Sequence, residues 1–105
     1  MKKIYEMTSE EIIENLLRVN SNTTLEEKKK KISKEDNDKL LKFANERLLD
    51  LYKNISNEDF NMLNHLDETV EEYINILKDT NIYTDEELEL CEFVMSFGIY
   101  SQINK

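Results

Sequence analysis

Apolar residues recur along much of this chain at spacings of three and four, which is the period of a helix that buries one face. The two longest apolar stripes predict helices over about residues 34–54 and 57–78. A shorter stripe, with charged residues opposite, predicts a helix over about residues 9–20. The pattern therefore indicates a helical protein in which each long helix turns one side toward a shared core.

A fourth helix is expected to begin after Thr84. Gly98 is its expected end, because glycine is common just beyond a helix C-terminus, and the short tail after it is expected to pack back. The predicted inward positions of this helix are Leu88, Cys91, Val94 and Met95. Over the whole chain, five residues are predicted to be buried: Leu48, Phe60, Val70, Leu88 and Val94.

Helix starts are marked by a hydroxyl residue that precedes a carboxylate by three positions, the pattern of a capping box or its aspartate variant. This pattern occurs at Thr8–Glu11, Ser33–Asp36, Ser56–Asp59 and Thr84–Glu87. The chain has no proline and only one glycine in 105 residues, so little interrupts its helices. We therefore predict an all-α fold, a small antiparallel bundle of about four helices, with residues 1–105 as a single domain.

The stretch from Thr24 to Ile32 allows two interpretations. A threonine followed three positions later by Glu27 could cap a short helix, but the only apolar anchors are Leu25 and Ile32. Four consecutive lysines, 28–31, repel one another between those anchors. Residues 21–33 are therefore interpreted as a marginal helical turn or a mobile basic arm. The lysines would be a solvated face or an intramolecular partner for acidic helices.

Charge is distributed unevenly between the two halves of the chain. Residues 1–55 contain 11 acids and 12 bases, whereas residues 56–105 contain 12 acids and 2 bases, which gives the second half a net charge of −10 within a total of −9. The acids of the last two predicted helices lie opposite the apolar stripes. We expect them to merge into one acidic face, formed by Asp67, Glu68, Glu71, Glu72, Asp85, Glu86, Glu89 and Glu92.

An acidic face of this kind has two interpretations, one without a specific function and one as a binding surface. It can simply keep a small protein soluble. It can also dock a protein with a basic surface, including a nucleic-acid-binding protein whose groove it would occupy in place of a nucleic acid backbone. Direct binding of nucleic acid is disfavoured, because phosphate affinity requires a basic footprint.

Catalytic, metal and cofactor chemistry finds little support in the sequence. His65 is the only histidine and has no partner in any catalytic motif, while Cys91 occupies a predicted inward position. Beyond one histidine and one cysteine, a zinc site would have to take its remaining ligands from carboxylates, which is unusual, and one glycine cannot build a phosphate-binding loop. We expect no enzyme activity, no metal and no cofactor. No apolar run is long enough to span a membrane, and one cysteine suits a reducing compartment, so the expected location is the cytoplasm.

A small helical chain whose last helix opens with the Thr84–Glu87 cap resembles the immunity proteins of class IIa bacteriocins in helix order and spacing. Its small, acidic, proline-poor composition is also similar to that of phage-encoded anti-defence inhibitors such as anti-CRISPR proteins. The first hypothesis is therefore a non-enzymatic protein that binds and inhibits or neutralises a protein partner. The alternatives are an immunity protein, or a structural or assembly subunit that forms a helical homo-oligomer.

Apolar residues that lie off the predicted stripes bear on the oligomeric state. Some of them must complete the core, while others could form a patch for a partner or for a second copy of the chain. The sequence therefore leaves open whether the protein is a monomer or a homodimer. These residues are Leu49, Met62, Ile76, Leu90, Phe93 and Phe97.

Overall fold

The computed structural model describes residues 2–54 and 60–103, and every regular element in this part of the chain is helical. The prediction of an all-α protein is therefore confirmed. The elements, in order, are a 3-10 turn η1 (Ile4–Glu6), α1 (Ser9–Ser21), α2 (Thr24–Lys30), α3 (Lys34–Phe43), a π-helical segment η2 (Ala44–Leu48), α4 (Leu49–Asn54), α5 (Phe60–Asp79) and α6 (Asp85–Ile103).

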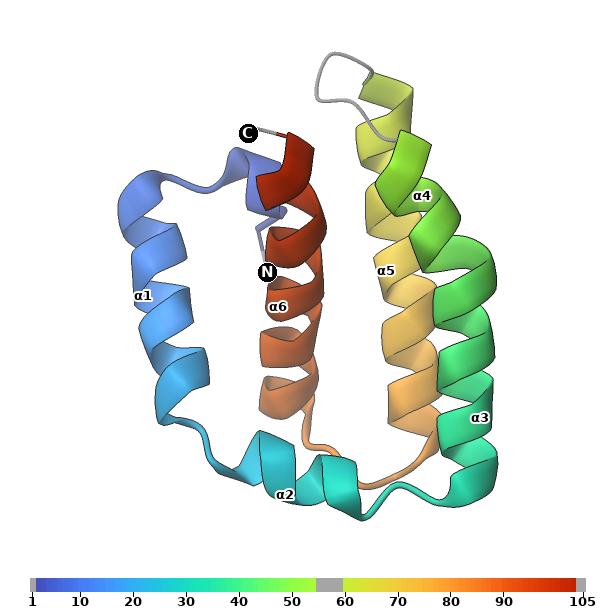
Figure 1. Ribbon diagram of the computed structural model, residues 1–105. Helices are drawn as coiled ribbons and strands as arrows, with labels where there is room; N and C mark the ends of the chain where they lie inside the picture. Colours follow the sequence, from blue (N-terminus) through green and yellow to red (C-terminus); the bar gives the residue numbers. More distant parts are fainter. Residues whose placement is uncertain (1, 55–59, 104–105) are drawn as a thin grey trace.

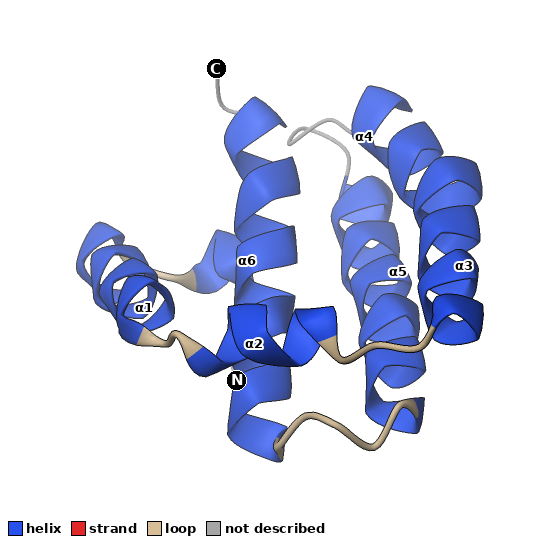
Figure 2. Ribbon diagram, turned by 60° about the horizontal axis from the view of Figure 1, so that its bottom comes forward, coloured by secondary structure: helices blue, strands red, loops and turns tan. Residues whose placement is uncertain are grey.

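The long helices stand side by side in a row, and α2 crosses one end of that row (Figure 1). α1 packs on α6, α6 packs on α5, and α5 packs on α3 and η2. The molecule measures 38 × 31 × 20 Å, so it is flat, and Figure 2 shows the row from a second direction. The predicted antiparallel bundle of about four helices is not confirmed, because residues 24–30 form a helix of their own and the main contacts run along the row.

The elements α3, η2 and α4 follow one another without a break, and we call them together the α3–α4 rod. The core lies where α6, α5 and this rod meet. Two clusters of buried side chains fill it, one made of Leu51, Leu66, Val70 and Ile99 and the other made of Leu40, Leu77 and Leu88. The predicted burial of Val70 and Leu88 is confirmed, and Leu48 is half-buried. The side chain of Phe60, also predicted to be buried, lies outside the described residues. These contacts make α5, which faces a neighbour on each side, the central support of the row.

The prediction that Val94 faces inward is wrong. Val94 is 43% exposed, while its neighbour Phe93 is fully buried, at 0%. The reason is that α6 has neighbours on more than one side: Leu88 and Ile99 belong to the clusters shared with α5, whereas Phe93 lies among residues of the N-terminal segment. A helix that is packed on several sides carries apolar residues around most of its circumference. Its sequence therefore shows no single apolar stripe from which the inward direction could be predicted.

The predicted helix starts are seen wherever the structure describes them. Thr8 and Glu11 form a complete capping box, with hydrogen bonds of 3.2 and 3.3 Å between each backbone N–H and the other side chain. Ser33 accepts a hydrogen bond of 3.2 Å from the backbone N–H of Asp36. The Thr84–Glu87 box is also formed. The predicted cap at Ser56 lies outside the described residues.

The predicted helix over 34–54 is present but contains the π-helical segment η2. A π turn takes one more residue than an α turn, so it rotates the faces beyond it relative to those before it. Leu41, which helical spacing from Leu48 places on the apolar stripe of this helix, is 53% exposed, while its neighbour Leu40 is buried. The guanidinium of Arg47, in η2, lies 5.3 Å from the centre of the ring of Phe43, the last residue of α3. The two side chains therefore form a cation–π contact within the rod.

Gly98 does not end the last helix, because α6 continues to Ile103. Its backbone has no positive φ, and a Cβ atom built on it would meet nothing within 4 Å. Neither backbone strain nor internal crowding therefore requires glycine at this position. Glycine in the interior of a helix costs about 0.5–1 kcal/mol relative to alanine.

We predict that Gly98→Ala raises the free energy of unfolding by about 0.5–1 kcal/mol, because alanine restricts the unfolded chain without a clash in the folded one. Urea unfolding followed by circular dichroism measures this change. Ser96→Ala, in the same helix, controls for general effects of alanine. A loss of stability in the Gly98 variant would show that the space beside Gly98 is not open.

Candidate functional site

The acidic residues of α5 and α6 are in large part paired with bases from the first half of the chain. Arg18 of α1 reaches Glu86 at 3.1 Å, and Arg47 of η2 contacts both carboxylate oxygens of Glu72, at 2.5 and 3.1 Å. These pairs hold α1 against α6 and the α3–α4 rod against α5. Both are well exposed and each contributes little to stability. The uneven charge distribution thus partly reflects pairing between the two halves.

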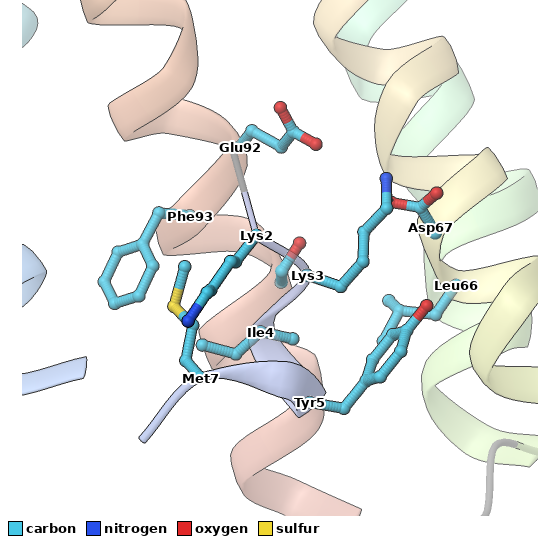
Figure 3. Close-up of a pocket in the computed structure, with 10 residues that line it drawn as sticks. Lys2, Lys3, Ile4, Tyr5, Met7, Leu66, Asp67, Glu92 and Phe93 are labelled. Carbon is cyan, nitrogen blue, oxygen red and sulfur yellow. The ribbon is translucent and has the colours of Figure 1, made fainter. Parts of the chain in front are cut away.

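Lys3 connects the N-terminal segment to the carboxylates between α5 and α6 (Figure 3). Its Nζ lies 2.6 Å from Oδ1 of Asp67 and 3.9 Å from Oε1 of Glu71. The hydrogen bond that Lys3 donates to Asp67 raises the pKa of Lys3, so the ammonium is held in its charged form. The cavity that remains here measures only about 10 Å³, so the N-terminal residues fill this site.

Glu92 lies beside this cluster and has no ion pair as close as that of Asp67. Burial raises its pKa, and the neighbouring carboxylates of Asp67 and Glu71 raise it further, while Lys3 lowers it. The carboxylates of Asp67, Glu71 and Glu92 thus all lie around Lys3. The arrangement favours the approach of a further cation.

A groove between α5 and α6 brings three of the predicted face residues together. It has a volume of about 380 Å³ and is lined by Glu71, Ile74, Asn75, Lys78, Asp85, Leu88 and Glu92. Carboxylates and aliphatic side chains therefore line the same hollow. Glu68 and Glu89 lie exposed on the same two helices, without ion pairs among the described residues. We refer to the groove with its three carboxylates, Glu71, Asp85 and Glu92, as the acidic groove.

Glu87 is predicted from the sequence to form part of a helix cap and is not one of the residues of the predicted acidic face. It is buried, at 6% exposure, and its Oε1 accepts a hydrogen bond of 2.9 Å from the backbone N–H of Thr84. Thr24 donates to its Oε2 at 2.7 Å, and Lys28 forms an ion pair with its Oε1. The bond from Lys28 is the largest cause that lowers the pKa of Glu87 to about 2.

The contacts of Glu87 resolve the ambiguous stretch in favour of a helix. α2 is attached to the start of α6 through Thr24 and Lys28, which lie four residues apart and so share one face. The sequence shows the capping pattern at Thr84 and also predicts, as one of two alternatives, that the lysines pair with the acidic helices. The specific pair was not visible, because 59 residues separate Lys28 from Glu87.

A second, apolar groove lies between α6 and the rod formed by η2 and α4. It has a volume of about 550 Å³ and is lined by Ala44, Asn45, Leu48, Leu49, Tyr52, Val94, Met95, Gly98 and Ile99. Three of its large side chains are well exposed: Leu49 at 45%, Tyr52 at 43% and Val94 at 43%. We call this the apolar groove. Leu49 is one of the surplus apolar residues of the sequence, whereas Val94 is predicted to be buried.

Groups that could carry chemistry are dispersed in the described residues. His65 is exposed on α5, and Cys91 is half-buried, with a thiol pKa that burial raises. In the part of the chain that the structure describes, no three His, Cys, Asp or Glu side chains are placed to hold a metal ion. No helix within residues 2–54 and 60–103 is long and apolar enough to cross a membrane.

Comparison of the chain with protein family models, curated proteins and solved structures finds no match. The acidic and apolar grooves are therefore interpreted from their own residues and geometry.

Proposed function

We propose that this protein is a non-enzymatic inhibitor or neutralising protein that acts in the cytoplasm by binding a protein partner with a basic surface. Phage-encoded anti-defence inhibitors are an example of this class. The observation that carries the proposal is the acidic groove, in which Glu71, Asp85 and Glu92 share a hollow with Ile74 and Leu88.

The composition of the acidic groove suits a lysine or arginine side chain of a partner. Such a side chain can lay its alkyl stem against Ile74 and Leu88 and keep its charged head among the carboxylates. Lys3 of the chain itself provides a precedent close by, since its ammonium lies between Asp67 and Glu71. The three carboxylates of the acidic groove outnumber its one lysine, Lys78, so a cation from a basic partner would enter a site with excess negative charge.

The net charge of −9 supports the same interpretation through association kinetics. A negative field accelerates encounter with a positive surface and makes association sensitive to salt. Local pairing removes Glu72 and Glu86 from the set of free carboxylates, because Arg47 and Arg18 occupy them. We therefore assign partner contact to the acidic groove and the adjacent Glu68 and Glu89, a smaller area than the full predicted face.

Neutralising the acidic groove is expected to weaken partner binding by about tenfold, mainly through slower association. The test variant is Glu71→Gln with Glu92→Gln. The matched control is Asp38→Asn with Glu46→Gln, which removes the same charge from exposed acids of the α3–α4 rod that have no ion pair among the described residues. Wild type and both variants are immobilised and exposed to extract of the source cells, and retained proteins are identified by mass spectrometry.

Calorimetry on the purified partner at two ionic strengths then separates the acidic groove from general charge. The proposal expects the control to bind like wild type, the groove variant to bind weakly, and wild-type affinity to fall as salt rises. The partner's own activity should fall on binding. An equal loss of affinity in the groove variant and the control, or an affinity that does not change with ionic strength, would contradict a role for the acidic groove.

A further inference from the structure

The N-terminal segment places a lysine of the chain itself at one end of the acidic groove. Nζ of Lys3 lies 2.6 Å from Oδ1 of Asp67 and 3.9 Å from Oε1 of Glu71. Glu71 is also a wall residue of the acidic groove, and Glu92 lines both that groove and the small cavity that Lys3 lines. Two of the three groove carboxylates are therefore shared between the acidic groove and the surroundings of Lys3.

The two ends of the acidic groove differ in charge. The connection over residues 80–84 joins α5 to α6, and Lys78 and Asp85 lie on either side of it. Glu71 and Glu92 lie about two helical turns away from these residues, on α5 and α6 respectively. The end near the connection thus combines an ammonium with a carboxylate, whereas the other end has two carboxylates. A cation from a partner is favoured at the Glu71–Glu92 end, which is also the end that Lys3 approaches.

Lys3 is fixed at its backbone and adjustable in its side chain. η1 packs on α6, Ile4 is buried at 4% exposure, and the ring of Tyr5 lies 6.4 Å from that of Tyr100. The side chain of Lys3 is 34% exposed, and its flexible four-carbon stem allows the ammonium to leave the carboxylates while Ile4 stays in place. A group tethered in this way acts at a high effective concentration, yet rotations of side-chain bonds alone can release it.

The neighbouring Lys2 carries the same charge but is placed differently. Figure 3 shows the ammonium of Lys3 next to Asp67, whereas the ammonium of Lys2 points away from Asp67 and Glu92. Lys2 forms an ion pair of 3.2 Å with Glu11 of α1, and its side chain is 60% exposed. Of these two adjacent lysines, Lys3 is therefore the one that lies among the groove carboxylates.

We propose that Lys3 is an internal competitor that occupies the Glu71–Glu92 end of the acidic groove until a basic side chain of the partner displaces it. This role rests on the proposed function, because it concerns access to the same groove. Both cations interact with the same carboxylates, and their like charges repel each other, so they disfavour each other at this end. The N-terminal segment therefore lowers the affinity of the acidic groove for a basic partner.

Replacing Lys3 is expected to strengthen the binding of a basic ligand. The probe is pentalysine, acetylated at its N-terminus and amidated at its C-terminus, titrated into the full chain by calorimetry at low salt. Lys3→Gln should bind this peptide about five- to tenfold more tightly than wild type, because one nearby like charge is removed from a partly exposed site. Lys3→Arg keeps the charge and should bind like wild type. The matched control, Lys2→Gln, should gain less than about twofold, because its charge is more distant from the groove and is screened.

Nuclear magnetic resonance of the isotope-labelled protein follows the displacement itself. Adding pentalysine should move the side-chain nitrogen signal of Lys3 toward the signals of exposed lysines, and the backbone amide signals of Glu71 and Glu92 should shift at the same time. If these amides shift while the Lys3 signal does not, or if Lys2→Gln gains as much affinity as Lys3→Gln, Lys3 is not a competitor, although the acidic groove still binds cations. If neither wild type nor Lys3→Gln binds pentalysine, the acidic groove is not a cation site and both proposals are wrong.

Discussion

Glu87→Gln is expected to lower the free energy of unfolding by roughly 2–3 kcal/mol at neutral pH, because hydrogen bonds to a charged group and a partly buried ion pair are lost together. The amide keeps the size of the side chain and can still accept a hydrogen bond from Thr84. It cannot neutralise the ammonium of Lys28, and so α2 loses its main attachment to α6. Urea unfolding at pH 7 measures the difference.

The effect of Glu87→Gln should depend on pH in a defined direction. The pKa of Glu87 is lowered from its ordinary value of 4.5 to about 2 in the folded protein. A lowered pKa means that the folded state favours the ionised form, so the extra stability is fully present above pH 4.5 and is lost as the pH falls toward 2. Wild type and variant should therefore converge in stability as the pH approaches 2.

The matched control for this experiment is Glu89→Gln, an exposed acid on the same helix without an ion pair in the part of the chain that the structure describes. It should change the free energy of unfolding by no more than about 0.5 kcal/mol. Hydrogen exchange adds a local readout, since amides of α2 should exchange faster in the Glu87 variant. Equal effects of the two variants at pH 7 would contradict the role assigned to the contact between Glu87 and Lys28.

Phe93→Ala is expected to cost about 3–5 kcal/mol of stability, the usual penalty for removing a buried aromatic side chain. Phe93 is fully buried, its ring is stacked on that of Phe97 at 5.8 Å between centroids, and Figure 3 shows it beside Ile4 and Met7. Small domains have only about 5–15 kcal/mol in total, so this variant should be close to unfolding at moderate temperature.

Val94→Ala tests the same helix one position later. Because Val94 is well exposed on the wall of the apolar groove, its replacement should cost less than about 1 kcal/mol in the monomer. Thermal unfolding of both variants compares them directly. If Val94→Ala proved the more damaging change at low protein concentration, the orientation of α6 described here would be wrong and the stripe predicted from the sequence would be right.

The contrast between these two residues shows why α6 was harder to predict than α5. The apolar stripe of α5 gave correct burial for Val70, because its other face carries exposed acids and asparagines that define the outside. In α6, buried Leu88, Leu90, Phe93 and Ile99 are distributed around the helix. A pattern with no single polar side leaves the inward direction undefined, and only the positions of η1, α1 and α5 determine it.

The acidic face was predictable only in part for a related reason. Spacing along a helix identifies which carboxylates point away from an apolar stripe, and it correctly placed Glu68 and Glu89 in the solvent. It could not show that Arg47 reaches Glu72 or that Lys3 reaches Asp67, since 25 residues separate the first pair and 64 the second. Those pairs depend on how the helices are arranged in the row.

The sequence by itself determined what local interactions control in this protein: an all-helical chain, and capped starts at Thr8, Ser33 and Thr84. A cap joins groups three residues apart, so its hydrogen bonds form wherever the turn forms. The tertiary structure alone decided the row of helices, the burial of Glu87 against α2, the continuation of α6 past Gly98 and the two grooves. These features depend on contacts between segments distant in sequence, whose packing energy outweighs local preference.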